Sequence, residues 1–347
     1  MYMSFIILED DEPEIIWEAI NNAQIVFHPK HSPNGSINYS EFQNLKREKE
    51  VIVFLDRNLF SSLMSLTKDG DLKSTKEKTM VALLMSWSQM NHLSISAGLA
   101  IMENASKYTD SHNAKIELGN FNNIFDFYPT QVWLNLALGK IDQIPNCDFS
   151  NTPYENSITY HESDDHFLMN FAAMLHLVRI YRDSEMSSVD KLLEFLNWYF
   201  DNLLISQYLN TYLVLLFSNQ DGIKAPKHVN SSLFERIEKG CINQSWDLTY
   251  LSNWSTFYWK ESKMNDVFLF ATEDIMLKNI FINTNSAGGL FNLINTVFSK
   301  RDAARIIQFF NEKTKDRIKP DFGENPTQYF KFLIDQEKKH LQQTIGL

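Results

Sequence analysis

Four acidic residues stand where they could share a metal ion. Asp56 ends the apolar run VIVFL, and Asp274 closely follows the run VFLFAT. Glu103 lies in the stretch LAIMEN, and Asp247 begins the stretch DLTYLSNW. Carboxylate oxygens are the ligands that Mg²⁺ and Mn²⁺ prefer, and converging carboxylates repel one another unless a cation neutralises them. We therefore expect these four acids to be metal ligands and catalytic residues.

Two short apolar runs predict the strands that would bring the first and last acids together. Residues 51–55 and 266–272 are rich in β-branched and aromatic side chains, as is typical of strands buried on both faces. Ligands of open α/β sheets bind at the carboxyl ends of the strands. If the two strands are parallel neighbours, Asp56 and Asp274 meet at that edge.

Helical periodicity fills most of the remaining chain, and glycine (11) and proline (9) are scarce enough to favour helix over an all-β fold. A helix over 74–90 has Ser74 or Thr75 as its N-cap, and Pro129 divides two further helices. The polar stretch 141–165 reads as a linker. Other helices are predicted at 94–108, 164–183, 187–217 (as two packed helices), 228–244, from Asp247 onward, 273–282, 288–320 and 325–343. These patterns predict the α/β class with few, parallel strands.

The order and context of the four acids resemble those of the PIN-like nucleases. In that family one acid follows the first strand, a helix supplies a second, an aspartate opens a later helix, and another follows a late strand in a T-x-D setting. Asp56, Glu103, Asp247 and Asp274 stand at these positions. Thr272 matches the hydroxyl residue before the last acid, and Asn58 matches a small polar residue after the first.

The resemblance implies a fold and an activity. The four acids would hold one or two Mg²⁺ or Mn²⁺ ions, and Thr272 and Asn58 would orient these acids without binding the metal. The activity would be hydrolysis of phosphodiester bonds, and the resemblance favours an endoribonuclease over a DNase. The nuclease core, a small parallel sheet flanked by helices, would be discontinuous. It would comprise 1–130 and 241–285, with a helical insertion at 131–240 and a helical C-terminal extension at 286–347.

Each acid also has a simpler interpretation. Asp56, Asp247 and Asp274 could be N-caps of the helices that follow them, and Glu103 could be a solvated residue of an amphipathic helix. The alternative function is a non-enzymatic α-helical interaction protein with a degenerate nuclease core. A regulated toxin or defence effector, restrained by a protein partner or by self-association into a homo-oligomer, would share the nuclease chemistry.

The charge of the chain limits how it could bind nucleic acid. A formal net charge of −11 disfavours general phosphate binding, so contacts with RNA would need local basic patches. Two patches are candidates. One comprises Lys73 and Lys76. The other comprises Lys300, Arg301 and Arg305, which a solvated helix face explains at least equally well.

The remaining motifs exclude several classes of protein. Cys147 and Cys241 lack CxxC spacing, which argues against a zinc knuckle or a disulfide framework and favours a reducing, cytoplasmic setting. No signal peptide and no apolar run long enough for a membrane helix are visible. The motif HESDDH (161–166) is expected to cap a helix rather than bind metal, and no nucleotide-binding glycine loop is present.

Overall fold

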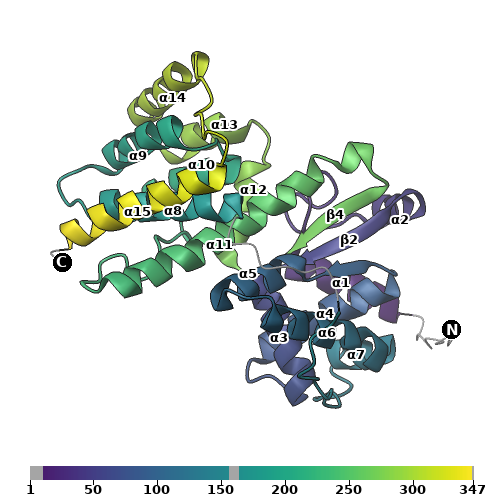
Figure 1. Ribbon diagram of the computed structural model, residues 1–347. Helices are drawn as coiled ribbons and strands as arrows, with labels where there is room; N and C mark the ends of the chain where they lie inside the picture. Colours follow the sequence, from purple (N-terminus) through teal and green to yellow (C-terminus); the bar gives the residue numbers. More distant parts are fainter. Residues whose placement is uncertain (1–10, 156–163, 346–347) are drawn as a thin grey trace. The chain divides into compact units, whose positions relative to one another are not determined.

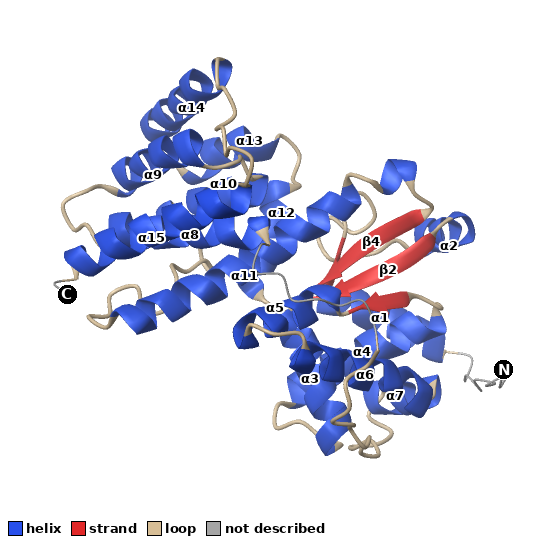
Figure 2. Cartoon of the chain, in the orientation of Figure 1, coloured by secondary structure: helices blue, strands red, loops and turns tan. Residues whose placement is uncertain are grey.

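The computed structural model describes residues 11–155 and 164–345, which form two compact units. The first unit contains residues 11–155 and 256–274, and the second contains residues 164–255 and 275–345. Every strand of the described chain belongs to the first unit, whereas the second unit is helical (Figure 2).

The first unit is built around a four-stranded sheet with the order β1-β4-β2-β3 (Figure 1). β2 (Glu50–Leu55), β3 (Ser94–Ser96) and β4 (Asp266–Ala271) are parallel, and β1 (Val26–Phe27) is antiparallel to β4. The α/β class and the strands β2 and β4 are as predicted. The sheet is mixed, however, and β3 occupies residues where the sequence predicts the start of a helix.

The two central strands bury both of their faces. Val53 and Leu269 lie side by side in register and point into the core formed with the helices of the first unit. On the opposite face, the ring of Phe54 lies 5.0 Å from that of Phe257 and 5.7 Å from that of Phe268. Burial on both sides explains why these strands are continuous apolar runs rather than alternating ones.

The helices of the first unit begin and end at clear local signals. The Ser74 hydroxyl accepts a hydrogen bond from the Glu77 N–H at 3.2 Å, which makes Ser74 the predicted N-cap of α4. Pro129 separates α6 from α7, also as predicted. The elements are α1 (Glu12–Ala23), α2 (Tyr39–Glu48), α3 (Arg57–Asp69), α4 (Thr75–Met90), α5 (Gly98–Tyr108), α6 (His112–Phe127), α7 (Thr130–Ala137) and the 3₁₀ helix η1 (Glu261–Lys263).

The second unit packs its helices around α10, in which every residue from Tyr208 to Phe217 is buried. Most of these residues are apolar, as is typical of a central helix, although Asn210 and Thr211 are buried as well. No helix in the described residues is both long and apolar enough to span a membrane. The helices are α8 (Asp165–Tyr181), α9 (Ser188–Asn202), α10 (Gln207–Phe217), α11 (Phe234–Tyr258), α12 (Ile275–Thr284), α13 (Gly289–Val297), α14 (Lys300–Lys315) and α15 (Pro326–Thr344).

One helix differs clearly from the sequence prediction. Two helices are predicted over 228–259, the second starting at Asp247, but α11 is continuous through this region. Two hydroxyl groups near the predicted break bond within the helix: Ser245 Oγ donates to the Cys241 carbonyl, and Thr249 Oγ1 donates to the Ser245 carbonyl, both at 2.6 Å. These bonds satisfy buried hydroxyl groups without ending the helix.

Candidate functional site

Asp56 lies where β2 ends and α3 begins. Its carboxylate is 1% exposed. Oδ1 accepts a hydrogen bond from the Leu59 N–H at 2.8 Å, so Asp56 is the N-cap of α3, as the simpler interpretation proposed. Oδ2 accepts a hydrogen bond from the Thr272 hydroxyl at 2.5 Å. Asp56 therefore joins the ends of two neighbouring parallel strands as well as capping a helix.

The end of β4 completes this arrangement. Leu55 and Ala271 are paired in register, so the next residues, Asp56 and Thr272, lie side by side. Thr272 is fully buried, and its Oγ1 also accepts a hydrogen bond from the Asp274 N–H at 3.0 Å. Glu273 and Asp274 are only partly buried, and Asp274 immediately precedes α12. The carboxyl edge of the sheet thus carries one buried and two partly exposed acids.

The charge environment of Asp56 differs from that of an ordinary helix cap. Burial raises the pKa of Asp56 from 3.8 to about 7. The hydrogen bonds from Thr272 and Leu59 lower the pKa, and the negative charges of Asp274 and Glu273 raise it further. Desolvation and like charge both disfavour an ionised carboxylate, so this edge of the sheet would attract a cation or a proton.

Glu103 lies on α5, the helix that follows β3, and it is partly buried. The first turn of α5 is tied to the residue after Asp56, because Arg57 Nη1 donates to the Ala100 carbonyl at 3.0 Å. Glu103 is one turn beyond Ala100 on the same helix. The structure therefore places Glu103 on a helix that contacts the start of α3.

An ion pair beside Asp56 was not predicted from the sequence. Arg57 binds the carboxylate of Glu117 on α6 with both terminal nitrogens, at 3.0 and 3.2 Å. Asn104 Nδ2 donates to the same carboxylate at 2.8 Å. The cluster joins α3, α5 and α6 near the carboxyl edge of the sheet. Its members are far apart in the sequence, and no local motif connects them.

Asp247 belongs to the second unit, whereas Asp56, Glu103 and Asp274 belong to the first. It lies in the middle of α11 and is partly buried. Its charge acts on Tyr212 of α10, where it adds to burial in raising the pKa of the phenol. The simpler interpretation of Asp247 as an N-cap is wrong, since α11 begins at Phe234.

Three of the predicted accessory residues of the first unit, Asn58, Lys73 and Lys76, are exposed. Asn58 lies on the first turn of α3. Lys73 and Lys76 lie beyond the other end of α3, beside the start of α4. The 13 residues of α3 span roughly 20 Å, so α3 separates the two lysines from Asp56 by most of its length.

The basic stretch of the second unit is partly used in internal contacts. Arg305 pairs with Asp190 of α9 at 2.7 Å, and Arg317 donates to the carbonyls of Phe200 and Leu203. Lys300 and Arg301, at the start of α14, are exposed. Of the three cations predicted to bind nucleic acid in this stretch, Arg305 is thus the one already engaged in an ion pair.

Two further observations bear on metal binding. Within the described residues, no three His, Cys, Asp or Glu side chains are arranged to hold a metal ion. In the motif HESDDH, Asp164 caps α8 by accepting a hydrogen bond from the Phe167 N–H at 3.0 Å, in agreement with the predicted capping role. The first three residues of that motif lie outside the described residues.

Comparisons with known proteins identify no relative of this chain. No protein-family model, curated protein or solved structure matches it. The arguments about function therefore rest on the carboxylates and their surroundings.

Proposed function

We propose that this protein is a metal-dependent phosphodiesterase of the PIN-like type, a nuclease whose favoured substrate is RNA. One observation carries the proposal: the buried Asp56 carboxylate, with its raised pKa, lies beside Thr272 and within the electrostatic influence of Glu273 and Asp274. This cluster stands at the carboxyl ends of adjacent parallel strands, where α/β proteins bind ligands.

The donor atoms at this edge fit a hard divalent cation. Carboxylate and hydroxyl oxygens suit Mg²⁺ and Mn²⁺, and Mg²⁺ is commonly held by one or two carboxylates while keeping several waters. A set of three protein ligands is therefore not required. A carboxylate has about four acceptor positions, and two hydrogen bonds occupy half of those on Asp56.

Asp56 and Asp274 would be the principal ligands, with Glu103 of the same unit as a further candidate. A bound divalent cation supplies a nucleophilic water and neutralises the charge that develops on the leaving oxygen. The Thr272 hydroxyl and the Leu59 N–H hold the two oxygens of Asp56 and so fix the plane of its carboxylate. Preorganised ligands of this kind keep their geometry when the charge nearby changes.

Cleavage assays with matched variants test this proposal. Full-length protein is incubated with labelled single-stranded RNA or DNA in Mg²⁺, Mn²⁺ or EDTA. We expect metal-dependent cleavage that falls at least 100-fold in Asp56→Asn and Asp274→Asn, because each variant removes a charged ligand but keeps its shape. Asp335→Asn, an exposed position on α15, is the control and should cleave normally.

Thermal melting with Mn²⁺ provides a second, independent readout. Wild-type protein should gain stability with the metal, and Asp56→Asn should gain much less. Equal cleavage by wild type and both Asn variants would contradict the assignment of the site. No cleavage together with no response to Mn²⁺ would contradict the proposed activity.

A non-enzymatic interaction protein is the second candidate function. A groove on the exposed surface of the helical second unit favours it. This candidate predicts that Mn²⁺ does not change the melting temperature, so the same experiment separates the two functions.

A further inference from the structure

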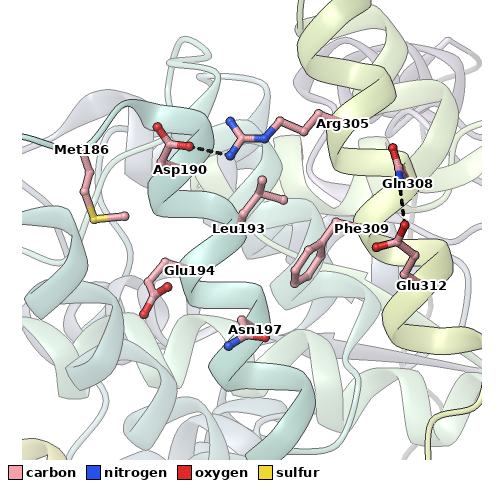
Figure 3. A pocket seen from close by; sticks show the side chains of 9 residues that line it. All are labelled: Met186, Asp190, Leu193, Glu194, Asn197, Arg305, Gln308, Phe309 and Glu312. Carbon is pink, nitrogen blue, oxygen red and sulfur yellow. Dashed lines mark hydrogen bonds and ion pairs between the residues drawn. The ribbon is translucent and has the colours of Figure 1, made fainter.

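A groove runs between α9 and α14 in the second unit, as Figure 3 shows. Its volume is about 570 Å³, compared with about 30 Å³ for one water molecule in the liquid. It can therefore receive several side chains of a docked segment. The lining residues are Met186, Asp190, Leu193, Glu194, Asn197, Arg305, Gln308, Phe309 and Glu312.

Both walls of the groove are regular helical stripes. The lining positions are 190, 193, 194 and 197 on α9, and 305, 308, 309 and 312 on α14. Each set follows the i, i+3, i+4, i+7 spacing of one helix face. The opposite faces are buried in the unit through residues such as Phe195 and Phe310. Each helix thus has a second, outward stripe that another element could cover.

Ion pairs fix the two walls against each other. Asp190 binds Arg305 at 2.7 Å, and further along both helices Asp201 binds Lys313 at 3.2 Å. Because the pairs occur in the same order on both helices, α9 and α14 run in the same direction. The groove is therefore a defined feature of the fold, with the Asp190–Arg305 pair at one end.

The lining has an apolar centre and acidic flanks. Leu193 and Phe309 project into the space between the helices (Figure 3). Glu194 and Glu312 are exposed carboxylates beside them. The lining residues comprise three acids and one base, a net charge of −2, and Gln308 Nε2 donates a hydrogen bond to Glu312 Oε1 at 2.7 Å. Such a surface repels nucleic-acid phosphates and attracts a basic partner.

We infer that this groove docks an amphipathic, basic helix of a separate partner protein. Apolar side chains of that helix would contact Leu193 and Phe309. Lysine or arginine residues one turn before and after them would meet Glu194 and Glu312. This arrangement is the helix-in-groove mode of recognition, read through anchors at i, i+3, i+4 and i+7. The inference does not depend on the proposed hydrolase activity.

Fluorescence anisotropy with full-length protein tests the inference. The probe is a labelled synthetic helical peptide with a Leu pair flanked by Lys one turn away on each side. A scrambled peptide of the same composition is the matched control. We expect the amphipathic peptide to bind at least tenfold more tightly than the scrambled one. Binding should weaken at least tenfold in Glu194→Lys but less than twofold in Glu235→Lys, an exposed acid on α11.

Several outcomes would overturn the inference. Equal binding of the two peptides, or equal affinity of wild type and Glu194→Lys, would show that the groove does not recognise a basic helix. Tighter binding of labelled oligouridine, reduced by Leu193→Asp, would make nucleic acid the occupant. Self-association that sedimentation detects in wild type but not in Glu194→Lys would make a second copy the occupant. Melting curves establish that each variant is folded.

Discussion

The two units each bury a carboxylate, and they satisfy it in different ways. In the second unit, Glu337 of α15 lies 3.0 Å from Nδ1 of His176 on α8, and Arg179 approaches the same oxygen at 3.8 Å. In the first unit, Asp56 takes its hydrogen bonds from a hydroxyl and a backbone N–H, and the charges that act on it are those of two other acids. Glu337 thus faces an imidazole and a guanidinium group, whereas Asp56 faces other acids.

This difference separates a structural contact from a candidate site. A buried acid that lies beside a base links two helices, as between α8 and α15. A buried acid beside other acids keeps an unfavourable charge, and only a proton or an external cation relieves it. Glu12, which lies 2.6 Å from Lys140, belongs to the first type, so Asp56 is the exception among the three buried carboxylates of the described chain.

The largest expected effect is a change in the pH dependence of stability at Asp56. Its folded-state pKa of about 7 exceeds the ordinary value of 3.8, so the folded protein holds the proton more tightly. The stability contributed by protonated Asp56 is fully present below its ordinary pKa and is lost as pH rises through about 7. Between these two pH values the free energy of unfolding should fall by roughly 4 kcal/mol. In EDTA, wild type should therefore lose stability relative to Asp56→Asn between pH 5 and pH 8.

Urea unfolding at both pH values measures this effect, with Asp335→Asn as the control. If the stability difference between wild type and Asp56→Asn is the same at pH 5 and pH 8, Asp56 titrates normally. Asp56 would then not differ from Glu337 in the way proposed.

The second prediction concerns the carboxylate that meets a base. His176→Leu removes the imidazole that lies 3.0 Å from the buried Glu337, and leaving a buried polar group without its partner should cost roughly 1 to 3 kcal/mol in the free energy of unfolding. The double variant His176→Leu/Glu337→Leu removes the buried charge as well and should recover most of the loss. Urea unfolding of both variants gives the comparison, and a double variant no more stable than the single one would contradict this account.

Lowering the pH should reduce the stability contributed by the His176–Glu337 contact, whereas it increases the stability contributed by Asp56. Burial lowers the pKa of His176 below its ordinary value of 6.5. The unfolded chain therefore binds the proton more readily than the folded protein does. The neutral His176 contributes stability above the ordinary pKa of histidine, and this stability is lost as pH falls below that value. In the double variant, stability should decline less steeply between pH 7 and pH 5 than in wild type.

The third prediction removes the hydroxyl group that holds Asp56. Thr272→Val keeps the shape of the side chain but removes the donor to Asp56 Oδ2, which should cost about 1 to 2 kcal/mol. Thr272→Ser keeps the donor and is the matched control. A loss in Thr272→Ser equal to that in Thr272→Val would mean that the methyl group, not the hydroxyl, matters here.

The smallest effect is expected at Lys140. Its side chain is 41% exposed, so its ion pair with Glu12 is partly screened by solvent. Lys140→Met should cost less than about 1 kcal/mol, as measured by urea unfolding. A loss as large as that of His176→Leu would show that exposure of the base does not control the strength of these contacts.

The sequence predicts the elements whose signals are local. The apolar runs of β2 and β4, the cap at Ser74 and the break at Pro129 each depend on a few neighbouring residues. β3 has the sequence Ser-Ile-Ser and only three residues, so its strand character comes from pairing with β2 rather than from its composition. The continuity of α11 was missed because aspartate is a favoured N-cap, yet Asp247 lies in the middle of this helix.

The candidate site could be predicted in part for the same reason. The adjacency of Asp56 and Thr272 follows once two strands that end at these residues pair in parallel. The Arg57–Glu117 pair depends on how α3, α5 and α6 pack, and no spacing in the sequence encodes that packing. The position of Asp247 in the second unit depends likewise on where α11 passes from one unit to the other.

The position of β4 has a consequence for how the protein is made. This strand lies between β1 and β2 in the sheet, yet the ribosome synthesises it only after residues 164–255 of the second unit. Because β4 separates β1 from β2, the sheet stays incomplete until β4 has been translated. Asp56 cannot contact Thr272 before that point, when most of the chain has been made. Contacts of such long sequence separation form late. A nascent chain therefore carries Asp56 long before it carries Thr272, Glu273 and Asp274, so this carboxylate lacks these three neighbours during most of synthesis.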